Sequence, residues 1–400
     1  MYIEIENEKL EKFTGKKLML FGASSTGVKA VEEFERIGAA ILGFCDNGEK
    51  KWGTELEGYK IYSPVQLQKL CHTDPSICIM ITSTYEKEIK EQLKTMQMPN
   101  VYVVHMGVLH SKQEYSQYRN TILSKDKANE KLKEMILSGN PFFVGRVGST
   151  ELETICNYKY FIDREHNPNI PYTNNITNML CDWCGFFPPD HKLMDEFCQM
   201  YLAEIKTADM LWCMWESRYE NKLLYECCPE TELTLYDETG FPYDIKEPWT
   251  MALKDKKVLV IHPFEQSIRE NYKIKDKLFT NKNFMPDFEL HTLKAVQTLA
   301  DNKSVPFQNW FEALESMKQK MQEIDFDVAL IGAGAYGFPL GAYAKKLGKQ
   351  ALHIGGMLQL FFGIRGKYYD QFHYHNENWT RPLEEEKPTG FKKVEAGRYW

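Results

Sequence analysis

Short apolar runs alternate with stretches of helical periodicity along the whole chain. In residues 1–112, buried strands are predicted by the apolar runs at 17–21, 40–44, 77–81 and 101–104. After the first of these runs, Val28, Val31 and Phe34 recur at the spacing of one helix face. Strands that alternate with helices in this way predict a parallel sheet with right-handed crossover connections.

Residues 131–400 repeat the alternation with longer insertions. Further strands are predicted at 141–144, 208–214, 257–261, 288–292, 327–331 and 350–354. Trp310, Leu314, Met317 and Met321 form the apolar stripe of a helix. The polar stretch 113–130 predicts a linker helix or hinge between the two regions. We therefore expect an α/β fold with two Rossmann-like parallel-sheet domains in tandem, at residues 1–112 and 131–400.

Composition narrows the class of protein. A net charge of −7 argues against a dedicated nucleic-acid-binding surface, which needs a basic face. The first residues are acidic and contain no apolar core of a secretory signal, and no run reaches the ~20 apolar residues of a membrane span. Ten cysteines in such a chain favour free thiols in a reducing compartment. We expect a cytoplasmic protein with no transmembrane segment; the oligomeric state stays open.

The first glycine turn, residues 22–27, lies between a predicted strand and a predicted helix. At such a turn the free N–H groups and the positive end of the helix dipole favour a phosphate. Asp46 ends the second strand, where an acidic residue can bind ribose hydroxyls. The alternative is a tight turn that only connects strand to helix. The candidate ligand residues of this domain are Gly22, Ser24, Ser25, Thr26, Gly27 and Asp46.

This first region resembles a known nucleotide-binding unit. The turn 21–27, the strand end 43–47 and the segment 58–64 are similar to the Rossmann unit of PglD-type sugar O-acyltransferases and of some sugar C-methyltransferases. The resemblance implies a second nucleotide- or sugar-binding module.

The second glycine turn, residues 332–337, matches G-x-G-x-x-G and stands between a strand and a helix. The next strand ends in His353-Ile354-Gly355-Gly356 and carries no carboxylate, which an NAD enzyme would be expected to have. The motif is therefore interpreted as a cradle for the diphosphate of a nucleotide sugar, and the alternative is that its glycines serve helix–strand packing. The candidate donor-binding residues are Gly148, Ser149, Gly332, Gly334, Tyr336, Gly337, Gly355 and Gly356.

A third turn, residues 145–153, carries charged groups directly after a strand. Ser149 is a good N-cap, and Glu151 and Glu153 lie in the first helical turn, so plain capping explains the pattern without a ligand. The segment also resembles the Arg-Phe-Gly-Asp-Gly-Glu motif of glycosyltransferases of the GT-D fold, with Arg146, Gly148 and Glu151 matching and Ser149 in place of the Asp. Similarity to that family continues through 258–264, the second glycine turn and 397–400.

The resemblance implies that Glu151 holds a metal ion or acts as base and that Arg146 compensates the charge of the leaving group. The implied cofactor is Mn²⁺ or Mg²⁺, with Glu151 as ligand, although Ser149 removes one carboxylate from the family's set. His262 ends a buried strand and is a candidate proton carrier or a structural histidine. One C-x-x-C, Cys181 to Cys184, has no second pair, which disfavours zinc.

The leading hypothesis is a glycosyltransferase that moves a sugar from a nucleotide-sugar donor to a glycan or glycoprotein acceptor in surface polysaccharide or glycoprotein biosynthesis. A non-catalytic nucleotide-sugar sensor or scaffold is the first alternative, and the replacement at Ser149 keeps it open. An NAD-dependent sugar-modifying enzyme is the second, because there are two Rossmann-like turns.

Overall fold

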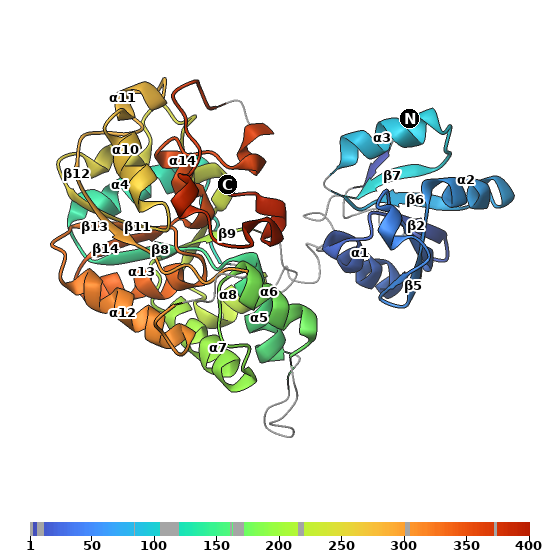
Figure 1. Ribbon diagram of the computed structural model, residues 1–400, viewed down its shortest axis with the longest axis horizontal. Helices are drawn as coiled ribbons and strands as arrows, with labels where there is room; N and C mark the ends of the chain where they lie inside the picture. The colour runs from blue at the N-terminus through green and yellow to red at the C-terminus, as the bar shows by residue number, and fades with distance from the viewer. Residues whose placement is uncertain are drawn as a thin grey trace. The chain divides into compact units, whose positions relative to one another are not determined.

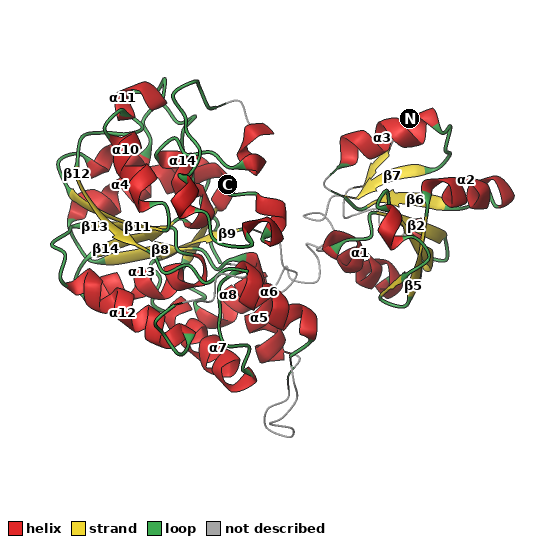
Figure 2. Ribbon diagram, in the orientation of Figure 1, coloured by secondary structure: helices red, strands yellow, loops and turns green. Residues whose placement is uncertain are grey.

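The computed structural model describes residues 3–5, 12–83, 85–104, 120–160, 162, 172–214, 220–300, 305–371 and 374–400. The chain divides into two compact units, Met1–Gln117 and Tyr118–Trp400. Each unit has its own sheet with helices on both faces (Figure 2). The predicted α/β fold with two Rossmann-like sheets is confirmed. Within the described residues, no helix combines the length and the apolar character needed to cross a membrane.

The sheet of the first unit has the order β1-β7-β6-β2-β3-β5-β4 and is parallel except for the β4–β5 hairpin. Its strands are β1 (Ile3–Ile5), β2 (Lys17–Phe21), β3 (Ala40–Cys45), β4 (Glu55–Leu56), β5 (Tyr59–Tyr62), β6 (Cys78–Ile81) and β7 (Val101–Val104). Its helices are α1 (Ser25–Arg36), α2 (Pro64–Thr73) and α3 (Glu86–Thr95). Because β3 and β6 flank β2 on opposite sides, the chain changes direction at the carboxyl end of β2.

Side chains of β2 alternate between two cores. Leu18 and Leu20 pack with α1, whereas Met19 and Phe21 pack in the core that α2 and α3 cover. Burial on both faces explains why this strand is a continuous apolar run in the sequence. The start of α2 is fixed locally, because Ser63 and Gln66 form a reciprocal capping box.

The second sheet is entirely parallel, with the order β10-β9-β8-β14-β13-β11-β12. Its strands are β8 (Phe142–Gly145), β9 (Met210–Cys213), β10 (Glu232–Leu235), β11 (Lys257–His262), β12 (Glu289–Lys294), β13 (Val328–Ile331) and β14 (Gln350–His353). The first strand, β8, pairs with the last, β14, so the switch point of this sheet lies between them.

Helices cover both faces of this sheet (Figure 1). One face packs against α5 (Ser149–Tyr160), α6 (Asn174–Trp183), α7 (His191–Ile205), α8 (Glu220–Cys227), α12 (Trp310–Gln322) and α13 (Gly337–Lys346). The other carries α4 (Lys125–Ser138), α9 (Tyr236–Thr239), α10 (Glu265–Tyr272), α11 (Lys275–Leu278), α14 (Leu358–Phe361) and the segment up to Trp400. The apolar stripe predicted for α12 is buried as expected.

The segment predicted as a linker meets the second unit. Residues 113–119 lie outside the described residues, but α4 begins at Lys125 and packs on the second sheet through Leu132 and Ile136. The amide of Asn129 donates to the Glu247 carbonyl at 2.9 Å and its Oδ1 accepts from the Trp249 N–H at 2.7 Å. Residues 125–130 therefore belong to the second unit and do not form a separate hinge.

The two glycine turns follow β2 and β13, which belong to different sheets, as predicted. Four further strands of the described residues were not predicted: β1, β4, β5 and β10. β5 reads Tyr-Lys-Ile-Tyr and β10 reads Glu-Leu-Thr-Leu, so polar residues interrupt the apolar run in each.

Candidate functional site

A cavity of about 600 Å³ opens at the carboxyl edge of the second sheet, at the switch point between β8 and β14. It is lined by Arg146, Gly148, Ser149 and Glu151 after β8, by His353, Gly355 and Gly356 after β14, and by Gly334 after β13. The strand ends therefore bring the charged turn of α5 and part of the second glycine turn to one site, as the strand–turn–helix order predicts.

The turn between β8 and α5 is shaped around the carboxylate of Glu151. A Cβ atom added to Gly148 would lie 2.2 Å from Oε2 of Glu151, so a larger residue here would displace the carboxylate from this position. Glu151 is 7% exposed. The guanidinium of Arg146 lies over the ring of Tyr236, 4.7 Å from its centroid. Gly148 thus has a defined task, which is to let an acidic side chain close over the helix start.

Tyr236 and Asp237 bring α9 to the cavity wall. The Tyr236 hydroxyl donates to the carbonyl of Ile354 and ties α9 to the end of β14. Burial raises the pKa of Tyr236, and the neighbouring Arg146 partly opposes that shift, so the phenol stays protonated. Asp237 follows at the cavity and is exposed. Neither residue was predicted, because β10 itself was missed.

The last residues of the chain form another wall. The guanidinium of Arg398 lies 4.0 Å from the centroid of the Tyr368 ring, and the backbone of the two residues is joined by a 3.1 Å hydrogen bond. Tyr399 packs against Gly356, where an added Cβ atom would lie 2.6 Å from the ring. Gly356 therefore serves the approach of an aromatic ring to the cavity.

Aromatic rings line the remaining side. The rings of Tyr243 and Tyr374 are 4.7 Å apart, and Phe241 stacks on Tyr243 at 5.2 Å. Tyr243 is 39% exposed, so part of this wall faces solvent. Burial raises the pKa of Tyr374, which keeps its hydroxyl neutral. Residues 372–373, which precede Tyr374, lie outside the described residues.

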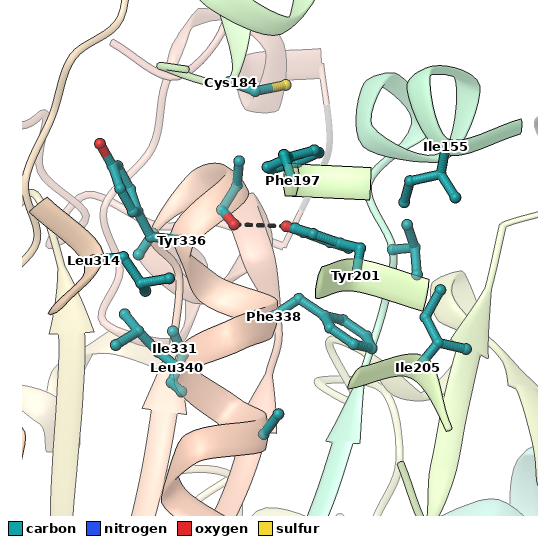
Figure 3. Close-up of a cluster of buried hydrophobic side chains, with 14 of the residues drawn as sticks. Ile155, Cys184, Phe197, Tyr201, Ile205, Leu314, Ile331, Tyr336, Phe338 and Leu340 are labelled. Carbon is teal, nitrogen blue, oxygen red and sulfur yellow. Dashed lines mark hydrogen bonds between the residues drawn. The ribbon is translucent and has the colours of Figure 1, made fainter. Parts of the chain in front are cut away.

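The second glycine turn is anchored from beneath. The hydroxyl of Tyr201 on α7 donates to the carbonyl of Ala335 at 2.6 Å (Figure 3). Gly334 adopts a φ of +53° and reaches the cavity. Tyr336 points into the core instead, stacked on Trp310 with ring centroids 4.8 Å apart and 8° between the planes. Tyr336 was predicted to bind the donor, but its ring is buried in the core and is not among the residues that line the cavity.

The outer glycines of the motif make room for two buried histidines. A Cβ atom at Gly332 would lie 2.7 Å from the ring of His262, and one at Gly337 would lie 2.3 Å from Nε2 of His353. Gly332 and Gly337 do not line the cavity. The donor-binding role predicted for these two positions stays a prediction, and their contacts match the alternative interpretation, in which the glycines serve close packing.

His262 is a structural residue. Its Nδ1 accepts a hydrogen bond from the N–H of Phe264 at 3.0 Å, and the ring is 4% exposed and outside the cavity lining. Burial lowers the pKa of His262 to about 3, so the ring is neutral at physiological pH. The structure therefore does not bring this predicted proton carrier to the site.

In the first unit, Asp46 closes the first glycine turn. Its carboxylate accepts from the N–H of Ala23 at 2.9 Å, from the N–H of Gly48 at 2.7 Å and from Nζ of Lys51 at 3.0 Å. Gly27 packs against the Gly22 carbonyl, 2.2 Å from a Cβ atom that any other residue would carry. Ser24 is exposed and Thr26 half-buried, while Ser25 begins α1. These contacts match the alternative interpretation of a connecting turn.

A metal ion would find few protein ligands in the cavity. Glu151 and Asp237 are the carboxylates in its lining, and the described part of the chain has no group of three acidic, histidine or cysteine side chains suited to a metal. Mg²⁺ is often held by one or two carboxylates together with substrate phosphates. The donor set fits an ion that arrives with a diphosphate, and it does not fit an ion held by the protein alone.

The comparison with family models finds a match within the first unit. The family described as C2185-like, N-terminal, matches residues 14–104. UDP-D-quinovosamine 4-dehydrogenase from Vibrio fischeri is 24% identical over 22% of this chain and 76% of its own, with a TM-score of 0.20. RSP, solved with beta-NAD+ and operator DNA, is 13% identical over 32% of this chain and 65% of its own, with a TM-score of 0.22.

One similar structure extends over most of the chain. The methyltransferase FkbM from Methylobacillus flagellatus is 11% identical over 86% of this chain and 81% of its own, with a TM-score of 0.26. A comparison with curated proteins gives no match. Likenesses of this size carry no argument about activity. None of the proteins named here is a GT-D glycosyltransferase, so that part of the sequence interpretation stays a prediction.

Proposed function

We propose that the second unit is a glycosyltransferase that uses a nucleotide-diphosphate sugar and that its donor binds in the cavity at the β8–β14 switch point. The supporting observation is the chemistry of the lining: two guanidinium groups, two carboxylates and several tyrosine rings surround one space of about 600 Å³. Such a volume lies within the ~300–1,000 Å³ typical of small-molecule sites.

The diphosphate is assigned to Arg146 and to the start of α5. A guanidinium presents a planar set of donors that matches phosphate oxygens. The first N–H groups of a helix have no partner within the helix, and α5 begins at Ser149, directly beside Arg146. Arg398 supplies a second cation from the opposite end of the sequence. During transfer, negative charge grows on the leaving diphosphate, and fixed cations stabilise it most in that state.

The carboxylates are assigned two tasks, accepting the proton of the acceptor hydroxyl and holding a metal ion that binds with the diphosphate. An acceptor hydroxyl must lose its proton as it attacks the sugar carbon, and Glu151 and Asp237 are the candidate bases in the lining. Mg²⁺ or Mn²⁺, when bound with the donor, would neutralise part of the diphosphate charge, with Glu151 and Asp237 as its protein ligands. Tyrosine faces such as those of Tyr243 and Tyr374 suit a nucleobase or a sugar ring.

The alternative of an NAD-dependent enzyme is less well supported. In a dinucleotide fold the strand after the glycine turn ends in an acidic residue that binds ribose hydroxyls. Here β14 ends in His353, and the ring of that histidine fills the space at Gly337. The alternative of a sensor without turnover has the same cavity and differs only in whether the donor reacts.

The test is a donor-turnover assay on the full chain. UDP-, GDP- and TDP-sugars are incubated with and without Mn²⁺ and a mixture of simple glycan acceptors, and the released nucleoside diphosphate is measured. A transferase releases it from one donor class, including slow hydrolysis without acceptor. Binding of a donor with no release would identify a sensor, and neither binding nor release of any nucleotide sugar would refute the proposal.

A further inference from the structure

A second buried histidine differs from His262 in where its ring lies. His353 ends β14, next to β8 at the switch point, and is 4% exposed. His353 belongs to the residues that line the cavity, whereas His262 does not. Nδ1 of His353 is buried and has no hydrogen-bond partner among the residues that the structure describes. A buried polar atom without a partner is costly, which points to a group that a ligand supplies.

The ring is held in place from both sides. Nε2 lies against Gly337, where even a methyl group would come within 2.3 Å. The ring of Phe338 meets it edge to face, with centroids 6.1 Å apart and 88° between the planes. A side chain held in this way before a ligand arrives loses little conformational freedom on binding.

The ring is also neutral. Burial, and to a smaller extent the nearby Arg146 guanidinium, lower the pKa of His353 to about 3. A neutral imidazole has one donor and one acceptor nitrogen, which is the pattern that a hydroxyl group complements. Charged phosphate oxygens next to this ring have Arg146 as the stronger partner.

We infer that His353 is a ligand-contacting residue that hydrogen-bonds a hydroxyl group next to the diphosphate of the bound nucleotide sugar. The inference rests on the proposed function, because it takes the cavity to be the donor site. The hydroxyl belongs either to the transferred sugar or to the ribose, and the two sources share the chemistry that the ring recognises. His353 thereby sets affinity for the donor and has no part in the charge compensation assigned to Arg146.

The chain offers a matched control. His353→Leu and His262→Leu each replace a buried imidazole that packs against a glycine of the same turn. Only the first changes a residue of the cavity lining. Gly337→Ala is a second, independent variant, because its methyl group displaces the His353 ring without adding any group to the cavity.

Affinities for UDP, UDP-glucose, GDP and GDP-mannose are measured by calorimetry on the full chain, with thermal unfolding as a check on folding. We expect His353→Leu and Gly337→Ala to weaken the sugar nucleotide that the wild type binds by about tenfold, since a lost hydrogen bond to a buried group is worth about 1.4 kcal/mol, or a factor of ten. His262→Leu lowers the unfolding temperature and leaves the dissociation constant within about twofold.

The comparison of free nucleotides with sugar nucleotides distinguishes the two possible sources of the hydroxyl group. Weaker binding of the sugar nucleotide alone assigns the hydroxyl to the transferred sugar, and equally weaker binding of the free nucleotide assigns it to the ribose. Unchanged affinity in folded His353→Leu overturns the inference and leaves the proposed function intact. A wild type that binds none of these four probes and none of the TDP-sugars of the turnover assay overturns both. If His353→Leu does not fold, the same criteria apply to Gly337→Ala and to the shift of the His353 ring nitrogens in ¹⁵N spectra on adding the bound nucleotide.

Discussion

The two glycine turns have the same order of strand, turn and helix, but different groups fill the space beside their glycines. In the first turn, Gly22 lies against the Thr82 carbonyl and Gly27 against the Gly22 carbonyl, so backbone packs on backbone. In the second, Gly332 and Gly337 lie against the imidazole rings of His262 and His353. One turn uses its glycines to tighten a helix onto a strand, and the other uses them to seat two buried titratable rings.

The polar groups beside the two turns also differ. Around the first turn, the carboxylate of Asp46 is engaged by Ala23, Gly48 and Lys51. Beside the second turn, the strand ends of the sheet enclose a cavity with Arg146 and Glu151 in its wall. A glycine-rich turn by itself therefore indicates close packing. A ligand site is indicated by polar side chains that line a cavity at the neighbouring strand ends.

Acidification is expected to have the largest effect, because it destabilises the unit whose glycine turn packs against two buried histidines. The folded-state pKa of about 3 for His262 and for His353 lies below the usual 6.5. The unfolded chain therefore binds more protons between these values, and the stability that the neutral rings contribute is present above pH 6.5 and is lost as the pH falls toward 3. We expect several kcal/mol of unfolding free energy to disappear from the second unit on going from pH 7 to pH 4.

Urea unfolding at each pH, followed by tryptophan fluorescence, measures this effect, because Trp52 is the only tryptophan in residues 1–117. His262→Leu removes one of the two titrating rings, so its stability should fall less steeply with acid than that of the wild type. Equal slopes would show that the rings of the second turn do not titrate as their burial requires.

Arg146→Ala tests the cavity itself. Removing a cation that stabilises a leaving group typically costs about 100-fold in turnover, or about 2.7 kcal/mol. Arg269→Ala is the control, because Arg269 is exposed and pairs with Glu265 on the outside of α10. Steady-state kinetics with the cognate donor should show the loss in kcat/KM for Arg146→Ala alone. Similar rates for both variants would remove Arg146 from the site.

Alanine substitutions compare the packing of the two turns directly. Gly27→Ala pushes a methyl group against a backbone carbonyl, whereas Gly332→Ala meets a side-chain ring first. Overpacking costs about 1–3 kcal/mol, and backbone yields less readily than a side chain. Hydrogen exchange measured by mass spectrometry should show each destabilisation confined to its own unit, with the larger effect for Gly27→Ala. A larger effect of Gly332→Ala would contradict this order.

Asp46→Asn should have the smallest effect. The variant keeps the size of the side chain and removes the charge that Lys51 and two backbone N–H groups share. Loss of such a partly exposed pair costs about 1 kcal/mol of stability in the first unit. Because Asp46 closes a turn, donor turnover should remain at the wild-type rate, and a clear loss of turnover would indicate that the first unit takes part in donor binding.

Much of the fold was predictable because buried parallel strands are continuous apolar runs. β2 and β11 follow their predicted ranges closely for this reason. The strand β10 was not predictable, because Glu232 and Thr234 alternate with leucines and its one ladder, with β9, is supplemented only by an isolated bridge between Leu233 and Ile122. Local pattern carries no information about such an edge strand until its partner is known.

The residues of the candidate site were predictable only where they are close together in the sequence. Arg146, Gly148 and Glu151 stand together in the sequence and stay together in the fold. The motif of the second turn could not show that the space at Gly337 is filled by the ring of His353, because that residue comes from another strand. Arg398 was noticed only as part of a resemblance, since its place beside Tyr368 depends on tertiary contacts.

The position of β14 also constrains how the second unit can assemble. β14 stands between β8 and β13, so without it the sheet consists of two separate halves, β10-β9-β8 and β13-β11-β12. On the ribosome, six strands of the second sheet, β8 to β13, emerge before β14, which joins the two halves. Until β14 emerges, each half exposes an unpaired edge. Pairings between strands so distant in sequence form slowly. During synthesis the second unit therefore passes through a stage in which two half-sheets with unpaired edges have formed and β14 has not yet joined them. Such a stage is prone to aggregation, and it is the stage at which this protein would depend most on chaperones.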